Sequence, residues 1–138
     1  MNTLILDSEA IGLLARPTPS NPKYRFTHKV LLQAEKAGAR VVVPAAVLAE
    51  QYRGGGHDQA IDSCLSRYEA IEVAHTDREL AKRAGNLLAR HGLGSAHHVD
   101  ACVAALSVTA DRTVILTSDP DDISRLTAGL PNVVVRGL

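Results

Sequence analysis

The sequence of 138 residues is poor in aromatic side chains, with three tyrosines, one phenylalanine and no tryptophan. Binding of single-stranded nucleic acid by stacking of bases depends on aromatic side chains, so the composition argues against that mode of binding. Basic and acidic residues balance at 15 each, which leaves no overall positive charge to attract a polyanion. The net charge near zero also leaves little repulsion between copies of the chain, and it favours a homodimer.

Cysteine is scarce as well, and Cys64 and Cys102 both fall among apolar residues of expected helices. Their spacing matches neither a zinc site nor a disulfide framework and is typical of core residues in a reducing compartment. The N-terminal residues MNTLILDSEAIGLL lack the features of a signal peptide, and no apolar run approaches the roughly 20 residues that span a bilayer. We therefore expect a soluble cytoplasmic protein with no membrane partner, and one domain over residues 1–138.

Short β-branched runs alternate with longer helical patterns along the chain. Because the short runs are apolar on both faces, they predict strands of a parallel sheet that is covered on each side. The expected strands are Thr3–Leu6, Arg40–Pro44, Ala70–Ala74, Thr113–Thr117 and Asn132–Arg136. The expected helices lie near Glu9–Ala15, His28–Ala37, Ala45–Tyr52, Asp58–Tyr68, Asp77–His91, His98–Ala110 and Asp121–Ala128. This alternation predicts a three-layer α/β/α domain with a central parallel sheet of about five strands.

Two irregular stretches interrupt the alternation. The segment Arg16–Tyr24 holds three prolines and is predicted to be a loop, and the glycine-rich segment Arg53–Asp58 breaks the chain shortly after Glu50. In open α/β sheets the ligand site lies beyond the carboxyl ends of the strands. The side chains that follow those ends therefore decide the function.

Four carboxylates are expected at that edge of the sheet. Two follow strands directly (Asp7 and Asp119), and two lie on helices near the same edge (Glu50 and Asp100). Carboxylates gathered in one place raise one another's pKa, and a bound divalent cation removes that cost. Oxygen ligands without histidine or cysteine at ligand spacing favour the hard ions Mg²⁺ and Mn²⁺.

Each carboxylate also has a structural interpretation. Asp119 precedes Pro120 and is suited to cap a helix, Asp7 could cap the helix that follows it, and Glu50 could lie on a solvated helix face. Asp121 does no more in this interpretation than favour a helix N-terminus.

Asp100 is the hardest of these residues to explain structurally. It stands at the head of the nearly apolar segment HHVDACVAALSV, where a carboxylate is costly unless it is paired, hydrogen-bonded or bound to a metal. An ion pair with Arg112 or Arg53 is the structural alternative. A zinc site that uses His97 and His98 is disfavoured, because adjacent helix residues point in different directions and no further ligand is suitably spaced.

Four segments resemble the signature of the PIN-domain family, namely LILDSEAI, VLAEQYRGG, HHVDACVAA and LTSDPDDI, in this order over nearly the whole chain. The resemblance implies a parallel sheet flanked by helices and an acidic Mg²⁺ or Mn²⁺ site that hydrolyses RNA phosphodiester bonds. Small bacterial members of the family are often VapC-type toxins of type II toxin–antitoxin systems. The resemblance therefore also implies a cognate antitoxin as partner.

The resemblance assigns roles to individual residues. The catalytic and metal-binding positions correspond to Asp7, Glu50, Asp100 and Asp119, with Asp122 as a further metal ligand. Thr117 and Ser118 match the small hydroxyl positions that would orient ligands or water. The Arg16–Tyr24 loop is longer and richer in proline than is expected of a minimal member.

Contacts with RNA and with a partner are expected away from the carboxylates. The basic residues nearest the expected site are Arg16, Lys23, Arg25 and Arg53, and these would contact the RNA backbone unless they are only solvated loop charges. A groove for the antitoxin is expected near residues 10–52, where AIGLLA and HKVLLQAEKAG place apolar residues at helical spacing. The alternative is that both apolar stripes pack on the sheet.

Two other classes of protein share part of the pattern. A receiver-like Mg²⁺-binding signalling domain also gathers aspartates at strand ends, but it would end its fifth strand with a lysine, where this chain has VVVRGL. A catalytically silent PIN-like domain that only binds an antitoxin is the second alternative.

Overall fold

The computed structural model describes residues 1–138 and contains one parallel sheet of five strands. The strands are β1 (Thr3–Leu6), β2 (Arg40–Pro44), β3 (Ile71–Ala74), β4 (Thr113–Thr117) and β5 (Val133–Gly137). Their order in the sheet is β3-β2-β1-β4-β5, with every neighbouring pair parallel. All five strands agree with the expected ones to within one residue at each end. The central position of β1 places Asp7 in the middle of the carboxyl edge of the sheet.

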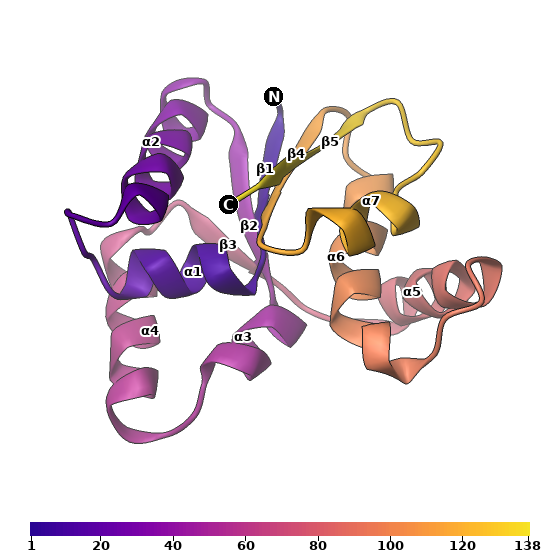
Figure 1. Ribbon diagram of the computed structural model, residues 1–138, viewed down its shortest axis with the longest axis horizontal. Coiled ribbons are helices and arrows are strands. Elements are labelled where there is room, and N and C mark those ends of the chain that lie inside the picture. The colour runs from indigo at the N-terminus through magenta and orange to yellow at the C-terminus, as the bar shows by residue number, and fades with distance from the viewer.

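Helices cover both faces of this sheet, as the alternation predicts. They are α1 (Ser8–Ala15), α2 (Pro22–Lys36), α3 (Ala45–Gln51), α4 (Gly55–Arg67), α5 (Arg78–Arg90), α6 (His98–Val108) and α7 (Pro120–Leu126), with a 3-10 turn η1 (Ser95–His97) before α6. Figure 1 shows α1, α2 and α4 on one side of the strands and α5, α6 and α7 on the other. Helix α3 lies at the carboxyl ends of the strands, because it begins directly after β2.

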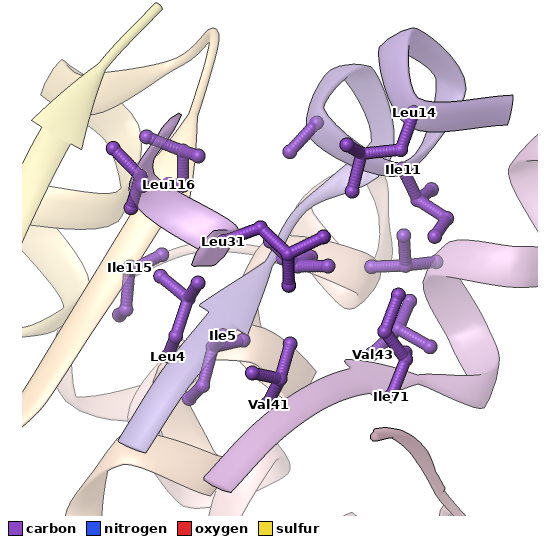
Figure 2. Close-up of a cluster of buried hydrophobic side chains, with 14 of the residues drawn as sticks. Leu4, Ile5, Ile11, Leu14, Leu31, Val41, Val43, Ile71, Ile115 and Leu116 are labelled. Atoms are coloured by element: carbon purple, nitrogen blue, oxygen red, sulfur yellow. The ribbon is translucent and has the colours of Figure 1, made fainter. Parts of the chain in front are cut away.

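The core is centred on β1 and its two neighbours. Figure 2 labels Leu4 and Ile5 of β1 in one buried cluster with Ile11 and Leu14 of α1 and Leu31 of α2. Burial of one such side chain stabilises the fold by about 1.5–3 kcal/mol. The expected apolar stripes of α1 and α2 thus pack mainly on the sheet, and Leu32 is the large apolar residue of α2 that remains exposed.

Helix α6 is almost wholly apolar because it is enclosed. Residues Ala101–Ala105 are all buried, with Val103 in the cluster that covers the sheet and its neighbours in a second cluster against α5 and α7. Small side chains let α5 and α6 pack closely along their lengths. Only the first turn of α6, which carries Asp100, reaches the carboxyl edge of the sheet. Cys64 and Cys102 are buried and unpaired, as expected.

The edge strands are less covered than a sheet buried on both faces would be. Glu72 and Val73 of β3 are exposed, as are Val134 and Arg136 of β5. Helix α7 packs against β5, but the helices still leave the two outer strands partly open to solvent. None of the helices combines the length and apolar character that a membrane span requires.

Two helices begin three or more residues earlier than the sequence analysis predicts, namely α2 and α4. The loop prediction for Arg16–Tyr24 is wrong for its last three residues, because α2 begins at Pro22. The Asn21 side chain accepts a hydrogen bond from the Lys23 amide, and a proline at the first helical position needs no amide partner. Helix α4 likewise begins at Gly55, within the glycine-rich break.

The strand order separates this fold from the receiver-like alternative. Receiver-like sheets have the order 2-1-3-4-5, in which the third strand lies beside the first. Here β3 pairs with β2 and lies at the edge of the sheet. The topology is therefore not that of a receiver domain.

Candidate active site

Asp7 is the most enclosed carboxylate of the site, with 5% of the residue exposed. Its amide continues the sheet by donating to the Leu116 carbonyl, so the residue extends β1 beside β4. Its Oδ1 accepts a hydrogen bond from the Ser8 amide at 2.8 Å, and its Oδ2 accepts one from the Thr117 hydroxyl at 2.6 Å. Burial raises the pKa of Asp7, the two hydrogen bonds oppose that rise, and the nearby Asp119 carboxylate adds to it.

Thr117 connects the ends of the two central strands. Its buried hydroxyl donates to Asp7 and accepts from the Asp119 amide at 3.0 Å, which orients both aspartates toward one place. Asp119 precedes α7, yet its side chain makes no capping hydrogen bond. Asp119 is the N-cap residue of α7 with Pro120 at the first helical position, as the capping interpretation expects, but its exposed carboxylate takes no part in the cap and is available to a ligand.

Asp100 and Asp122 approach the same place from the other face of the sheet. Asp100 lies in the first turn of α6 and Asp122 in the first turn of α7. Burial raises the pKa of Asp100 to about 6, and the carboxylates of Asp7, Asp122 and Asp119 contribute in that order. His97 is its nearest basic group, with Nδ1 3.8 Å from Oδ2.

The arginine pairing considered for Asp100 does not occur. Arg112 lies at the amino end of β4, where its carbonyl accepts hydrogen bonds from Asn2 and Thr3. Arg53 donates to the carbonyls of Ala49 and Tyr52. The arginine partner that would explain Asp100 structurally is therefore absent.

Glu50 is exposed, like Asp119, and reaches the group from α3. Partial burial raises the pKa of its carboxyl, Asp7 adds to the rise, and Arg53 opposes it. The side chain of the next residue anchors α3 to α1, because Gln51 Nε2 donates to the Ser8 hydroxyl at 2.8 Å. Gly12 of α1 leaves room for this contact, since a Cβ there would lie 2.9 Å from Gln51 Oε1.

The chemistry of this donor set is compatible with a divalent cation. Carboxylates from four separate parts of the chain meet here, neighbouring carboxylates raise the pKa of Asp7, Glu50 and Asp100, and no lysine or arginine forms an ion pair with any member of the group. The members of the group are Asp7, Glu50, Asp100, Asp119 and Asp122. Repulsion of this kind is relieved by a hard cation with oxygen ligands.

His97 is the residue that the sequence analysis missed. Its ring nitrogen and carboxylate oxygens of Asp100 and Asp122 all lie within 4.8 Å of one another. His97 and His98 point in different directions, as the sequence analysis expected, so they cannot bind one ion together. The informative spacing was that of His97 and Asp100, because residues three apart share a helix face.

Of the residues expected to orient water or bind RNA, only some lie near the carboxylate group. Ser118 is exposed and makes no side-chain hydrogen bond. Arg16 lies at the end of α1 remote from Asp7 and approaches His57 Nδ1 at 2.7 Å, and Arg25 donates to the Pro19 carbonyl. Arg53 alone of the three arginines lies near a carboxylate of the group.

The largest hollow in the surface lies elsewhere. It has a volume of about 590 Å³ and lies at the amino ends of the strands, beside Met1, Arg112 and Asn132. No carboxylate cluster accompanies it. A smaller hollow of about 320 Å³ lies close to the site, between α1 and α3, and includes Glu9, Leu13 and Gln51.

Comparison with known proteins identifies one family model and several solved structures that this chain resembles. A family model described as PIN domain matches residues 14–128. A chain of VapBC2 from Rickettsia felis bound to a promoter DNA fragment superposes with a TM-score of 0.66 at 16% identity, over 99% of this chain and 98% of that chain. A chain of DNA-bound VapBC from Salmonella typhimurium gives a TM-score of 0.63 at 16% identity over 99% and 98%.

A chain of a toxin-antitoxin complex from Klebsiella pneumoniae gives a TM-score of 0.66 at 16% identity, over 98% of this chain and 99% of that chain. At this identity these structures show a shared fold. A sequence comparison with curated proteins finds no significant match.

Proposed function

The chain belongs to the PIN-domain family, and on that premise we propose that it is a metal-dependent endoribonuclease, the toxin of a type II toxin–antitoxin pair. The observation that carries the proposal is the convergence of carboxylates at the carboxyl edge of the sheet without an arginine or lysine partner. A purely structural cluster would be paired, because unpaired carboxylates in one place reduce stability.

Each acidic residue has a role in this proposal. Asp7, Asp100 and Asp119 would hold Mg²⁺ or Mn²⁺, with Glu50 and Asp122 as ligands at the margins of the site. When bound, such an ion activates water for attack on phosphorus and offsets negative charge on the phosphate. Thr117 holds Asp7 and the Asp119 backbone in place, and the free Ser118 hydroxyl is available to orient water or substrate.

RNA would be held beside the carboxylates by local positive charge. Arg53 is the best candidate, because it lies near Glu50 and is exposed. Arg16 and Arg25, farther along α1 and α2, would contact the backbone of a longer RNA. The neutral net charge means that the cation itself supplies much of the attraction for phosphate.

The partner proposal is supported by the fold shared with chains of VapBC complexes. A cognate antitoxin would bind near residues 10–52, where a hollow of about 320 Å³ lies between α1 and α3. A homodimer is compatible with the low net charge. Co-expression with the product of the adjacent gene should yield a stable complex without ribonuclease activity, and failure to bind would remove the toxin assignment while leaving the ribonuclease.

The activity is tested by incubating the purified chain with total RNA, with and without Mg²⁺ or Mn²⁺, and mapping the new ends. Asp100→Asn keeps the shape of the side chain and removes its charge. We expect cleavage to fall by about two orders of magnitude, the scale of several kcal/mol of lost charge stabilisation. Asp121→Asn, at an exposed position of α7, is the matched control, and it should cleave like the wild type. Metal-independent cleavage, or none by any form, would contradict the proposal, and the latter would favour the silent binding domain.

Thermal melts of the same variant give a second readout. Without metal, Asp100→Asn should be at least as stable as the wild type, because one repelling charge is gone. Mg²⁺ should raise the melting temperature of the wild type and raise that of the variant less. A loss of roughly 3–5 kcal/mol without metal, with the Mg²⁺ response intact, would instead mean that Asp100 neutralises a buried cation.

A further inference from the structure

His97 faces the carboxylate group, and its side chain makes no hydrogen bond that would explain its position structurally. It ends η1 and precedes α6, yet its side chain makes no capping hydrogen bond. The 3.8 Å between its Nδ1 and Asp100 Oδ2 is longer than a hydrogen bond. The imidazole is partly shielded, with 31% of its side chain exposed, and it lies beside Asp100 on the side of Asp122.

The spacing of these three side chains is close to that of ligands around one ion. Donor atoms bound about 2.1 Å from one cation lie about 3–4 Å apart. One ring nitrogen of His97 and one carboxylate oxygen each of Asp100 and Asp122 lie within 4.8 Å of one another, so small side-chain rotations would bring them into range. Helices α6 and α7, which carry the two aspartates, pack against each other and hold this spacing (Figure 1).

We propose that His97 is a ligand of the cation held at Asp100 and Asp122, and that its nitrogen makes the site select Mn²⁺ over Mg²⁺. This inference rests on the proposed function, because it concerns the cation of the same site. Mg²⁺ binds almost only oxygen, whereas Mn²⁺ lies in the series of metals that also gain from imidazole. Because most of the donor atoms are carboxylate oxygens, the site still favours a hard ion.

The neighbouring histidine provides a matched control. His98 Nε2 lies 4.0 Å from Cys102 Sγ, one turn along α6, so its ring points away from the carboxylates. His97→Gln and His98→Gln therefore remove the same chemical group one residue apart. Only the first should alter metal selectivity.

The experiment measures metal binding by the metal-free full-length chain. Free Mn²⁺ is followed by electron paramagnetic resonance while Mg²⁺ is added as competitor. We expect the wild type to bind Mn²⁺ at least about tenfold more tightly than Mg²⁺, and His97→Gln to lose about tenfold in Mn²⁺ affinity while its Mg²⁺ affinity changes less than about threefold. His98→Gln should match the wild type in both.

Pulsed electron paramagnetic resonance of bound Mn²⁺ gives a direct signature of the nitrogen ligand. Modulation from ¹⁴N should be present in the wild type and in His98→Gln and absent in His97→Gln. His97→Asn replaces His97→Gln if circular dichroism shows that the latter does not fold.

The outcomes separate this inference from the proposed function. Mn²⁺ bound without ¹⁴N modulation, and with unchanged selectivity in His97→Gln, would overturn the role of His97. RNA cleavage by the same samples would still support the nuclease. A chain that binds neither ion would overturn both, whereas nitrogen-ligated Mn²⁺ without RNA cleavage would support His97 and count against the nuclease.

Discussion

At the scale of single residues, the site depends on one buried hydroxyl. Thr117 bonds to Asp7 Oδ2 and to the Asp119 amide, and it is fully enclosed. Water cannot replace either bond in so closed a position. Thr113, in the same strand, is also buried, but its hydroxyl has no hydrogen-bond partner.

This contrast gives a prediction about two equivalent substitutions. Thr117→Val keeps the side-chain shape but leaves the Asp119 amide without its partner and removes a bond from Asp7, so unfolding should become easier by about 1–3 kcal/mol. Thr113→Val removes an unpaired hydroxyl and should be neutral or stabilising. Urea unfolding of both variants measures the difference, and equal effects would mean that the Thr117 bonds contribute little.

Asp100 makes the stability of the metal-free protein depend on pH. Burial and the neighbouring carboxylates raise its pKa from 3.8 to about 6, so the folded state binds a proton more tightly than the unfolded chain. Unfolding then releases protons, and the free energy of unfolding should fall as pH rises from about 4 to about 6 and level off above that. Urea melts at several pH values in metal-free buffer test this. In Asp100→Asn the slope should be smaller, and a slope that is unchanged would place the effect in other carboxylates.

At the scale of elements, the loop between α3 and α4 depends on a glycine conformation. Gly54 has φ 85° and ψ 165°, a region open almost only to glycine, and Gly55 also has a positive φ of 51°. These backbone angles reverse the chain direction between α3, which carries Glu50, and α4, which packs on α1. Gly56, one residue further, has ordinary helical geometry and open space around its Cα.

Alanine substitutions at Gly54 and Gly56 therefore distinguish the effect of backbone strain from the effect of helix propensity. Gly54→Ala should destabilise the fold by about 1–3 kcal/mol, because an alanine resists this backbone conformation. Gly56→Ala should stabilise it by up to about 1 kcal/mol, because alanine is the better helix former. Thermal unfolding of the two variants checks the opposite signs, and a shared sign would contradict the account of the loop.

At the scale of the whole molecule, two apolar clusters lie around one sheet. The larger joins the sheet to α1, α2 and α4, and the smaller joins α5, α6 and α7. Helix α6 belongs to both, since Val103 lies in the first cluster and Leu106 packs against each. We therefore propose that residues 1–138 fold as one unit.

Calorimetry tests whether the chain unfolds in one cooperative transition. One transition is expected, with equal calorimetric and van 't Hoff enthalpies and a value of about 95 kcal/mol near 60 °C for a chain of this length. Two resolved transitions would show that α5, α6 and α7 unfold separately from the rest. The measurement is made without metal, so that ligand binding does not couple the two clusters.

The sequence by itself determined the elements and most of the acidic positions. All strands were predictable because β-branched apolar runs report burial locally, and Asp7 and Asp119 follow directly from the strand ends. The start of α2 differs from the prediction, because three prolines predict a loop whereas Asn21 caps a helix that accepts Pro22 at its first position. The family motifs also pointed to Glu50, Asp100 and Asp122.

Only the tertiary structure decided which of these residues meet. The sheet order places β4 beside β1, and this pairing lets Thr117 bond across 110 residues to Asp7. The packing of α6 against α7 brings His97 and Asp122 to Asp100, a relation between distant segments that no local pattern contains. That no arginine lies beside Asp100 is also a relation between distant segments, and the sequence alone did not predict it. Local propensity sets the elements, whereas distances between side chains on different elements follow from how the elements pack.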